Sequence, residues 1–174
     1  MAIQIDIARE AHELDAVRAL LRTFVAWHRE RHIEDRALID RYFDAAAFER
    51  ELAALPGDYA PLLLATCDGR PAGCVALRRL ADGAGEVKRM YVDTRFRGRG
   101  VGVALTARVL EDAVARGYRT LRLDTSVRQV EALALYRRFG FTEIEPYYEV
   151  GDDLRAWLVF MERTLEVPGS DAPI

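Results

Sequence analysis

The segment that most constrains the fold of this chain is a glycine-rich junction between a predicted strand and a predicted helix. The run EVKRMYV at residues 86–92 is typical of a strand, and apolar positions after residue 100 follow helical spacing. The junction contains RGRGVG, residues 97–102. A strand that passes through glycines into a helix directs several backbone N–H groups and the positive helix end at one point. The segment therefore predicts an anion-binding site.

The residue types of this loop narrow the anion to a phosphate or pyrophosphate. Gly98, Gly100 and Gly102 have no Cβ, so a ligand can approach the backbone closely. Arg97 and Arg99 add positive charge at the rim. The spacing does not match the G-x-G-x-x-G dinucleotide fingerprint, and the chain has no Gly-Lys-Ser/Thr triplet of a Walker loop. A basic surface turn without a ligand is the alternative.

The rest of the chain alternates between strand and helix patterns. We expect helices over residues 13–31, 36–55, 100–116 and 127–139. We expect strands over residues 2–8, 61–67, 72–80, 86–92, 118–126, 141–145 and 154–165. No linker divides this pattern, which predicts a single domain over residues 1–165 followed by a flexible C-terminal tail over residues 166–174.

Composition excludes several function classes. The formal net charge of −3 argues against a general nucleic-acid binder. No apolar run approaches the roughly 20 residues that span a bilayer, and the first residues lack a signal-peptide pattern. Cys67 and Cys74 are too few for a disulfide framework and lack metal-motif spacing. We therefore expect a cytoplasmic protein without nucleic-acid or membrane partners. Lys88 is the only lysine, which we ascribe to a compositional preference for arginine.

Three motifs in order resemble the GNAT superfamily of acyl-CoA-dependent N-acetyltransferases. RGRGVG is similar to its R/Q-x-x-G-x-G/A acyl-CoA loop, and MYVDTRF to the strand and turn that precede it. ALALYRRFGF, with Tyr136, Gly140 and Phe141, resembles its later helix and Gly-Phe pair. The resemblance covers residues 3–165. It implies an α/β fold of the α+β type, with a mixed central sheet of six to seven strands, split after the fourth strand and flanked by helices.

The resemblance also implies the acyl donor and its binding residues. Acetyl-CoA would place its pantetheine arm along the main chain of Met90, Tyr91 and Val92. Its pyrophosphate would lie against the loop residues Arg97, Gly98, Arg99, Gly100, Val101 and Gly102. Such enzymes form a ternary complex in which the amine attacks directly, so the reaction needs neither a cysteine nucleophile nor a metal.

Two residues match catalytic positions of the superfamily. Tyr136 matches the tyrosine that protonates the departing thiolate, and a side chain with pKa near ~10 is neutral at working pH. It could instead orient the thioester or pack in the core. Glu86 resembles the general base of the histone-modifying branch. If Arg78 or Lys88 holds it ionised, it is an electrostatic anchor rather than a base.

The acceptor site is assigned by the same resemblance. Trp27, His28 and Tyr42 belong to the helical segments that cover the acceptor pocket, and Tyr147 lies in a loop expected at its mouth. Asp124 ends a strand where the superfamily often has a polar ligand-binding residue. Simple packing, or a strand cap for Asp124, is the alternative in each case. His28, Glu30 and His32 form H-x-E-x-H, which is not a zinc motif, so no metal is expected.

Three functions remain open at this stage. The first is transfer of an acetyl group from acetyl-CoA to a primary amine of a small molecule. The second is acetylation of a protein lysine or N-terminus, and the third is a non-catalytic acyl-CoA-binding regulatory module. Long helices before the central hairpin and the aromatic Pro146–Tyr148 loop indicate a covered pocket, which favours a small-molecule amine acceptor. A homodimer is one of the expected assemblies.

Overall fold

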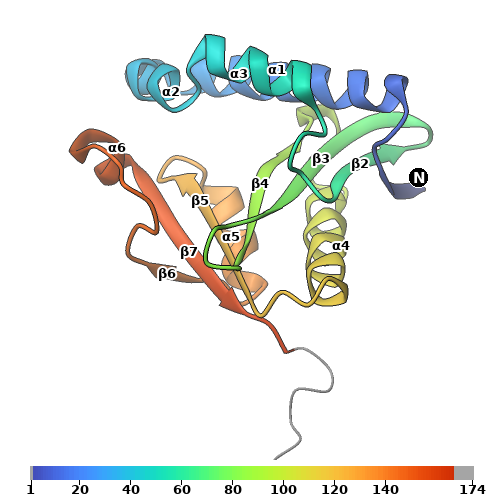
Figure 1. Ribbon diagram of the computed structural model, residues 1–174. Helices are drawn as coiled ribbons and strands as arrows, with labels where there is room; N and C mark the ends of the chain where they lie inside the picture. Colours follow the sequence, from blue (N-terminus) through green and yellow to red (C-terminus); the bar gives the residue numbers. More distant parts are fainter. Residues whose placement is uncertain (1, 167–174) are drawn as a thin grey trace, which may run out of the picture.

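The computed structural model describes residues 2–166, which form one seven-stranded mixed sheet with helices on both faces (Figure 1). The strand order is β1-β2-β3-β4-β5-β7-β6. The strands are β1 Ile3–Ile7, β2 Leu62–Cys67, β3 Arg70–Arg79, β4 Gly85–Val92, β5 Thr120–Ser126, β6 Thr142–Ile144 and β7 Leu158–Thr164. The predicted fold class is confirmed. From residue 167 on, the predicted tail lies outside the described residues.

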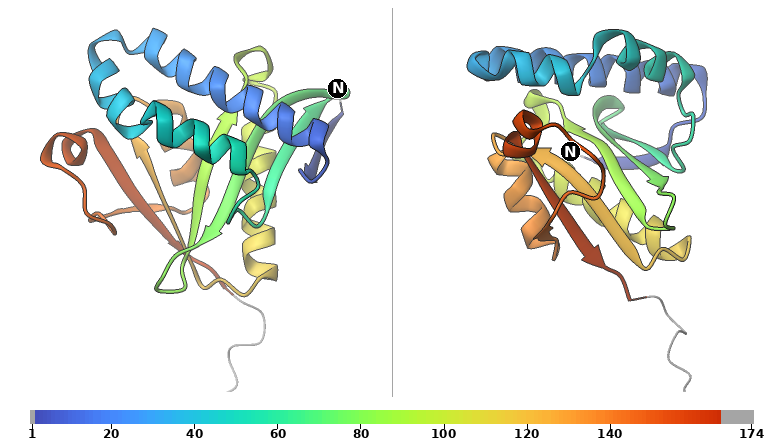
Figure 2. Two further views of the ribbon diagram at one scale, coloured as in Figure 1. Left: turned by 45° about the horizontal axis from the view of Figure 1, so that its top comes forward. Right: turned by 60° about the vertical axis from the view of Figure 1, so that its left-hand side comes forward.

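Three helices follow β1, and three more each lie between two of the later strands, from β4 to β7. They are α1 Ala11–Arg31, α2 Arg36–Tyr42, α3 Ala45–Ala54, α4 Val101–Ala115, α5 Val130–Arg138 and α6 Asp152–Trp157, with short 3-10 turns at Ile33–Asp35 and Thr94–Phe96. Figure 2 shows α1, α2 and α3 crossing one face of the sheet, away from α4 and α5. Each face buries its own apolar cluster against these helices. In the described part of the chain, no helix is long and apolar enough to cross a membrane.

The sheet opens between β4 and β5. These two strands are parallel, and their pairing is confined to Gly85 with Leu121 and Glu86 with Arg122. Beyond these pairs the strands diverge, and Figure 1 shows the resulting V-shaped opening below α1–α3. Along the diverging part the backbone of β4 has no strand partner on this side, so its N–H and C=O groups can bind a ligand.

A bulge in β4 lies at this opening. Ala76 of β3 pairs with Lys88 and Cys74 with Tyr91, so β4 carries an extra residue between these pairs. Arg89 within it has a φ of 56°, in the left-handed region that side chains other than glycine seldom adopt. In a regular strand, successive side chains point to opposite faces. With the bulge, Lys88 and Arg89 both line the same cavity.

Two predicted elements were wrong in their extent. The helix expected over residues 36–55 is divided into α2 and α3. The break falls before Asp44, whose side chain accepts a hydrogen bond from the Ala47 N–H (2.8 Å) and thereby starts α3 as an N-cap. The strand expected over residues 154–165 begins only at Leu158, because the preceding residues form α6. Leu154 and Trp157, three residues apart, are both buried on one side of that helical turn.

Candidate active site

A groove of ≈ 460 Å³ lies where β4 leads into α4. It is lined by the end of β4 and the glycine-rich loop, and by α1 and α5 on the opposite wall. All of the expected main-chain positions from Met90 to Val92 line it, as do Arg97, Gly98, Gly100, Val101 and Gly102. Arg99 is not among the residues that line the groove; its guanidinium lies over the Phe96 ring.

The local backbone explains why the loop is rich in glycine. Gly98 and Gly100 have φ values of 71° and 86°, which a residue with a Cβ adopts only with strain. Gly100 is the N-cap of α4, and the first hydrogen bond across that turn runs from the Ala104 N–H to the Gly100 carbonyl (2.9 Å). The N–H groups of a first helical turn have no partner within the helix, and the helix dipole favours an anion there.

Arg97 is folded across this groove. Its Nε donates a hydrogen bond to the Val92 carbonyl (3.1 Å), and its guanidinium carbon lies 4.1 Å from the centre of the Trp27 ring. Trp27, expected at the acceptor pocket, thus lines this groove rather than the neighbouring cavity. The Val92 carbonyl, which accepts this hydrogen bond, is one of the groups that the resemblance assigns to the pantetheine arm. If that assignment holds, the Arg97 side chain must move when the arm binds.

A smaller cavity of ≈ 60 Å³ continues from the groove into the opening between β4 and β5. The two spaces share Phe24, Met90 and Gln129 as lining residues, so they adjoin at the β4 bulge. The other lining residues of the cavity include His28, Tyr42, Lys88, Arg89, Asp124, Ser126, Tyr136 and Trp157. Its volume is well below the range of about 300–1,000 Å³ typical for drug-sized ligands.

Tyr136 projects from α5 to this cavity. The side chain is buried, and its ring meets Phe141 edge to face with centroids 5.9 Å apart. Burial, and to a lesser degree the negative charge of Asp124, raise the pKa of its hydroxyl well above its ordinary value. Tyr136 is therefore protonated at neutral pH, as a proton donor must be.

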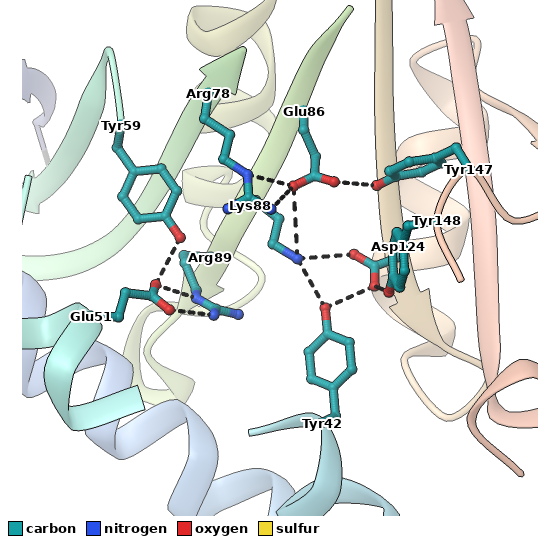
Figure 3. A network of polar contacts seen from close by, with 10 residues as sticks. All are labelled: Tyr42, Glu51, Tyr59, Arg78, Glu86, Lys88, Arg89, Asp124, Tyr147 and Tyr148. Carbon is teal, nitrogen blue, oxygen red and sulfur yellow. Dashed lines mark hydrogen bonds and ion pairs between the residues drawn. The ribbon is translucent and has the colours of Figure 1, made fainter. Parts of the chain in front are cut away.

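Lys88 and Asp124 bridge the opening of the sheet (Figure 3). Lys88 Nζ on β4 lies 3.3 Å from Asp124 Oδ1 on β5. The Tyr42 hydroxyl accepts a hydrogen bond from Lys88 (3.2 Å) and donates one to Asp124 Oδ2 (2.9 Å). Burial alone would raise the pKa of Asp124, but the charge of Lys88 and the hydrogen bonds from Tyr148 and Tyr42 lower it below its ordinary value. Asp124 is therefore held ionised.

Glu86 has its carboxylate engaged on both sides. The side chain is 1% exposed, and its Oε1 accepts a hydrogen bond from Arg78 Nε (2.8 Å). Its Oε2 accepts one from the Tyr147 hydroxyl (2.7 Å), and Lys88 Nζ lies 3.9 Å from Oε1. Glu86 does not line the cavity. The Arg78 partner expected from the sequence is present, and the roles of Glu86 as electrostatic anchor and as proton acceptor both stay predictions.

The loop after β6 closes the site with two tyrosines. Tyr147 reaches Glu86 on β4, and the neighbouring Tyr148 donates a hydrogen bond to Asp124 Oδ2 on β5 (2.6 Å). Burial, with Asp124 as the next cause, raises the pKa of both hydroxyls. The loop that the sequence placed at the acceptor mouth therefore contacts both sides of the opening, as Figure 3 shows.

Comparisons with known proteins match this architecture to one family. The model of the acetyltransferase (GNAT) family matches residues 17–141. An IAA acetyltransferase of Azospirillum brasilense is 34% identical over 162 residues, which cover 92% of this chain and 98% of that protein. This chain belongs to the GNAT acetyltransferase family.

Two further proteins are similar to this GNAT protein, one over part of its sequence and the other in its fold. Human N-acetylaspartate synthetase is 39% identical over 99 residues, 56% of this chain but 32% of that enzyme. The solved structure of the PaiA N-acetyltransferase from Thermoplasma acidophilum in complex with coenzyme A covers 95% of this chain and all (100%) of that one. It has a TM-score of 0.70 at 18% identity, which shows a shared fold. The family uses acetyl-CoA.

His28 lies against the cavity of this GNAT protein within a group of aromatic rings. It stacks with Trp157 (centroids 5.6 Å apart) and Phe24 (5.9 Å) and is 2% exposed. Burial, and then the nearby His32, lower the pKa of His28 to about 4, so its ring is neutral. Within residues 2–166, no group of three or more His, Cys, Asp or Glu side chains is arranged to hold a metal ion.

Sequence reasoning missed several polar residues of the site. Lys88 was named only as a partner of Glu86, and no sequence signal predicted its contact with Asp124 at the cavity. No sequence signal predicted the pair of Arg89 and Glu51 either: they are 38 positions apart, and only the fold brings the Arg89 guanidinium onto the Glu51 carboxylate. Tyr148 was quoted with its loop but not assigned to the site.

Proposed function

We propose that this protein transfers an acetyl group from acetyl-CoA to the primary amine of a small molecule by direct attack in a ternary complex. The observation that carries the proposal is the junction of the two spaces at the β4 bulge. A groove suited to the long acyl donor meets a small, aromatic and charged cavity there, and Met90 lines both. A thioester bound along β4 would present its carbonyl to that cavity.

The groove has the chemistry that the acyl donor requires. The α4 N-terminus and the glycines at 98 and 100 offer backbone N–H groups and close approach for a pyrophosphate. The unpaired edge of β4 from Met90 to Val92 can bind the amides of pantetheine. Bound acetyl-CoA supplies the activated acyl carbon, which no side chain of the protein provides.

The residues around the cavity can manage the protons of the transfer. An amine with pKa near ~10 is mostly protonated at neutral pH and must lose a proton before it attacks. As the new C–N bond forms and the C–S bond breaks, Tyr136 is placed to donate its hydroxyl proton to sulfur. The nitrogen loses two protons in all: the one lost before attack passes to water, since both nearby carboxylates already accept several hydrogen bonds, and the one lost from the adduct restores the Tyr136 hydroxyl through water.

The size of the cavity supports a small acceptor over a protein. A volume of ≈ 60 Å³ leaves room for only a few heavy atoms beside the acyl group. The tyrosines at 147 and 148 close the opening by hydrogen bonds to carboxylates on both strands. Human N-acetylaspartate synthetase, a partial relative, is named for a small acetylated amino compound.

The test is a screen for acceptor-dependent release of free CoA from acetyl-CoA, over amines, amino acids, polyamines, aminoglycosides and peptides. We expect turnover with at least one small amine and none above background with peptides. Tyr136→Phe should lower kcat by about 10- to 100-fold and leave acetyl-CoA affinity within a few-fold, because the hydroxyl acts only on the leaving sulfur. Turnover with peptides alone, or an equal loss of binding and turnover in the variant, would contradict the proposal.

A further inference from the structure

Arg89 is held rigidly beside the cavity. Its Nε and Nη2 donate to the two carboxylate oxygens of Glu51 on α3, at 2.8 and 2.7 Å. Its guanidinium carbon lies 5.2 Å from the centre of the Phe43 ring and 5.6 Å from that of Phe48. The Tyr59 hydroxyl in turn donates to Glu51 (2.7 Å). A side chain fixed on so many sides loses little freedom when it binds a ligand.

One nitrogen of this guanidinium remains for a ligand. Figure 3 shows Nη1 directed away from Glu51, toward the space between Lys88 and Tyr42. Among residues 2–166, no hydrogen bond from Nη1 is found, although the side chain is only 12% exposed. Nη1 is not among the fully buried polar atoms that lack a partner in residues 2–166, so it is accessible, and Arg89 lines the cavity. A hydrogen-bond acceptor of a ligand in the cavity can therefore reach it.

The backbone under Arg89 is strained in order to place it so. The φ of 56° costs on the order of 1–2 kcal/mol for a residue with a Cβ, and the bulge interrupts the pairing of β4 with β3. Without the bulge, Arg89 would point to the opposite face from Lys88. Strain of this kind persists where the position of the side chain matters for function.

We propose that Arg89 Nη1 binds a carboxylate of the acceptor, so that the acceptor is a small amino acid or a similar compound with its amine and carboxylate a few bonds apart. This rests on the proposed function. Arginine forms strong charge-assisted hydrogen bonds to carboxylates. The amine of such a compound then lies toward Tyr136 and Met90, where the cavity meets the donor groove.

The charges around the cavity fit an acceptor that carries both signs. Arg89 is balanced by Glu51 and Lys88 by Asp124, so the walls are close to neutral overall. A purely cationic polyamine finds no unpaired carboxylate there, because Asp124 already accepts hydrogen bonds from Tyr42, Tyr148 and Lys88. A compound with one carboxylate and one amine brings its acceptor oxygens to the one guanidinium nitrogen that has no hydrogen-bond partner among residues 2–166.

The decisive measurement compares each amino acid with its carboxamide, for example glycine with glycinamide and L-alanine with L-alaninamide, by kcat/KM in the intact wild-type protein. We expect the carboxylate to be preferred at least 100-fold. The comparison is stringent, because a carboxamide has the less basic amine and thus more free amine at neutral pH. If both members of every pair react within 10-fold of each other, the inference is overturned while the proposed function stands.

Substitutions of Arg89 then test whether this residue causes the preference for the carboxylate. Arg89→Met should reduce it to below 10-fold, and Arg89→Lys, which keeps the charge without the planar geometry, should give an intermediate ratio. The matched control is Arg22→Met, because Arg22 donates the same two hydrogen bonds to Glu49 on α3 but at the surface. An unchanged preference in a folded Arg89→Met protein would overturn the assignment. If Arg89→Met fails to fold, an unchanged carboxylate preference in Arg89→Lys would overturn the assignment instead.

The two proposals fail in different ways. If only peptides are acetylated, both are wrong. If only amines without a carboxylate are acetylated, the small-molecule function stands and the carboxylate site is wrong. Acetyl-CoA affinity, measured for each variant, should stay within a few-fold of the wild-type value, because Arg89 lines the cavity and not the groove.

Discussion

Replacing Gly100 by either aspartate or asparagine tests whether the N-terminus of α4 binds the pyrophosphate. Gly100 has φ 86° and ψ 0°, and a Cβ built there meets no atom within 4 Å. Either side chain therefore fits without a clash and points to open space. The backbone strain, about 1 kcal/mol for residues that tolerate this region, is shared by both variants and cancels between them.

The two variants differ in one negative charge. A carboxylate about 6 Å from a pyrophosphate with roughly two negative charges is repelled by about 1.4 kcal/mol in bulk water and by about 5.5 kcal/mol at an effective dielectric constant near 20. These limits correspond to a loss of about 10-fold to 10,000-fold in affinity. We therefore expect Gly100→Asp to bind CoA at least 10-fold more weakly than Gly100→Asn.

The thermal stabilities of the ligand-free variants should not follow the order of their CoA affinities. The negative charge of an aspartate at the start of α4 interacts favourably with the helix dipole, so Gly100→Asp should be at least as stable as Gly100→Asn. Calorimetric titration with CoA and thermal unfolding of the free proteins measure the two effects. Added salt should narrow the affinity gap because it screens the charges. Equal affinities of the two folded variants would refute a pyrophosphate site at Gly100.

Two further substitutions test the charged and titrating groups of the site. Glu86→Gln should lower the unfolding temperature, because it leaves Arg78 without its counter-ion, and should leave the shape of the kcat–pH profile unchanged; a loss of kcat confined to low pH would instead identify Glu86 as the base. Burial lowers the pKa of His28 from 6.5 to about 4, so the unfolded chain binds this proton more readily than the folded protein does. Protonation of His28 should therefore lower the free energy of unfolding of the wild type by about 2–3 kcal/mol as the pH falls from 7 to 4.5. His28→Phe should remove that part of the slope in urea unfolding, and an identical slope in both proteins would show that His28 is not its source.

Local signals were sufficient where one segment determines the site. The strand, the glycines and the helix start are adjacent in sequence, so one segment is enough to predict the loop at residues 97–102, most of which lines the groove; phosphate binding there stays a prediction. Tyr136 was found from its distance to the Gly-Phe pair, and the structure places it at the cavity. The turn at Asp68–Gly69, with φ of 48° and 75°, forms the expected hairpin between β2 and β3.

Signals were missing where the site is assembled from distant segments. Lys88 and Asp124 are 36 positions apart, and the sequence does not show that β4 and β5 separate before these two residues. The bulge at Arg89 has no glycine or asparagine to mark its positive φ, because Glu51 and two aromatic rings hold the strained conformation instead. Tertiary contacts of this kind override local preference.

Three buried ion pairs lie near the opening of the sheet, and their positions have a structural explanation. Burying an ion pair seldom stabilises a protein more than apolar packing would, so stability does not explain why Arg78–Glu86, Lys88–Asp124 and Arg89–Glu51 gather here. Each of the latter two links β4 to an element with which it forms no backbone ladder at that point: Asp124 lies on the diverging end of β5, and Glu51 on α3. The Lys88–Asp124 pair thus joins β4 and β5 where the ladder is missing, and the Arg89–Glu51 pair joins β4 to α3. Because these links use side chains, the edge of β4 that faces β5 keeps its main chain for other partners: Arg97 Nε donates to the Val92 carbonyl there, and under the proposed function the acyl donor would displace it.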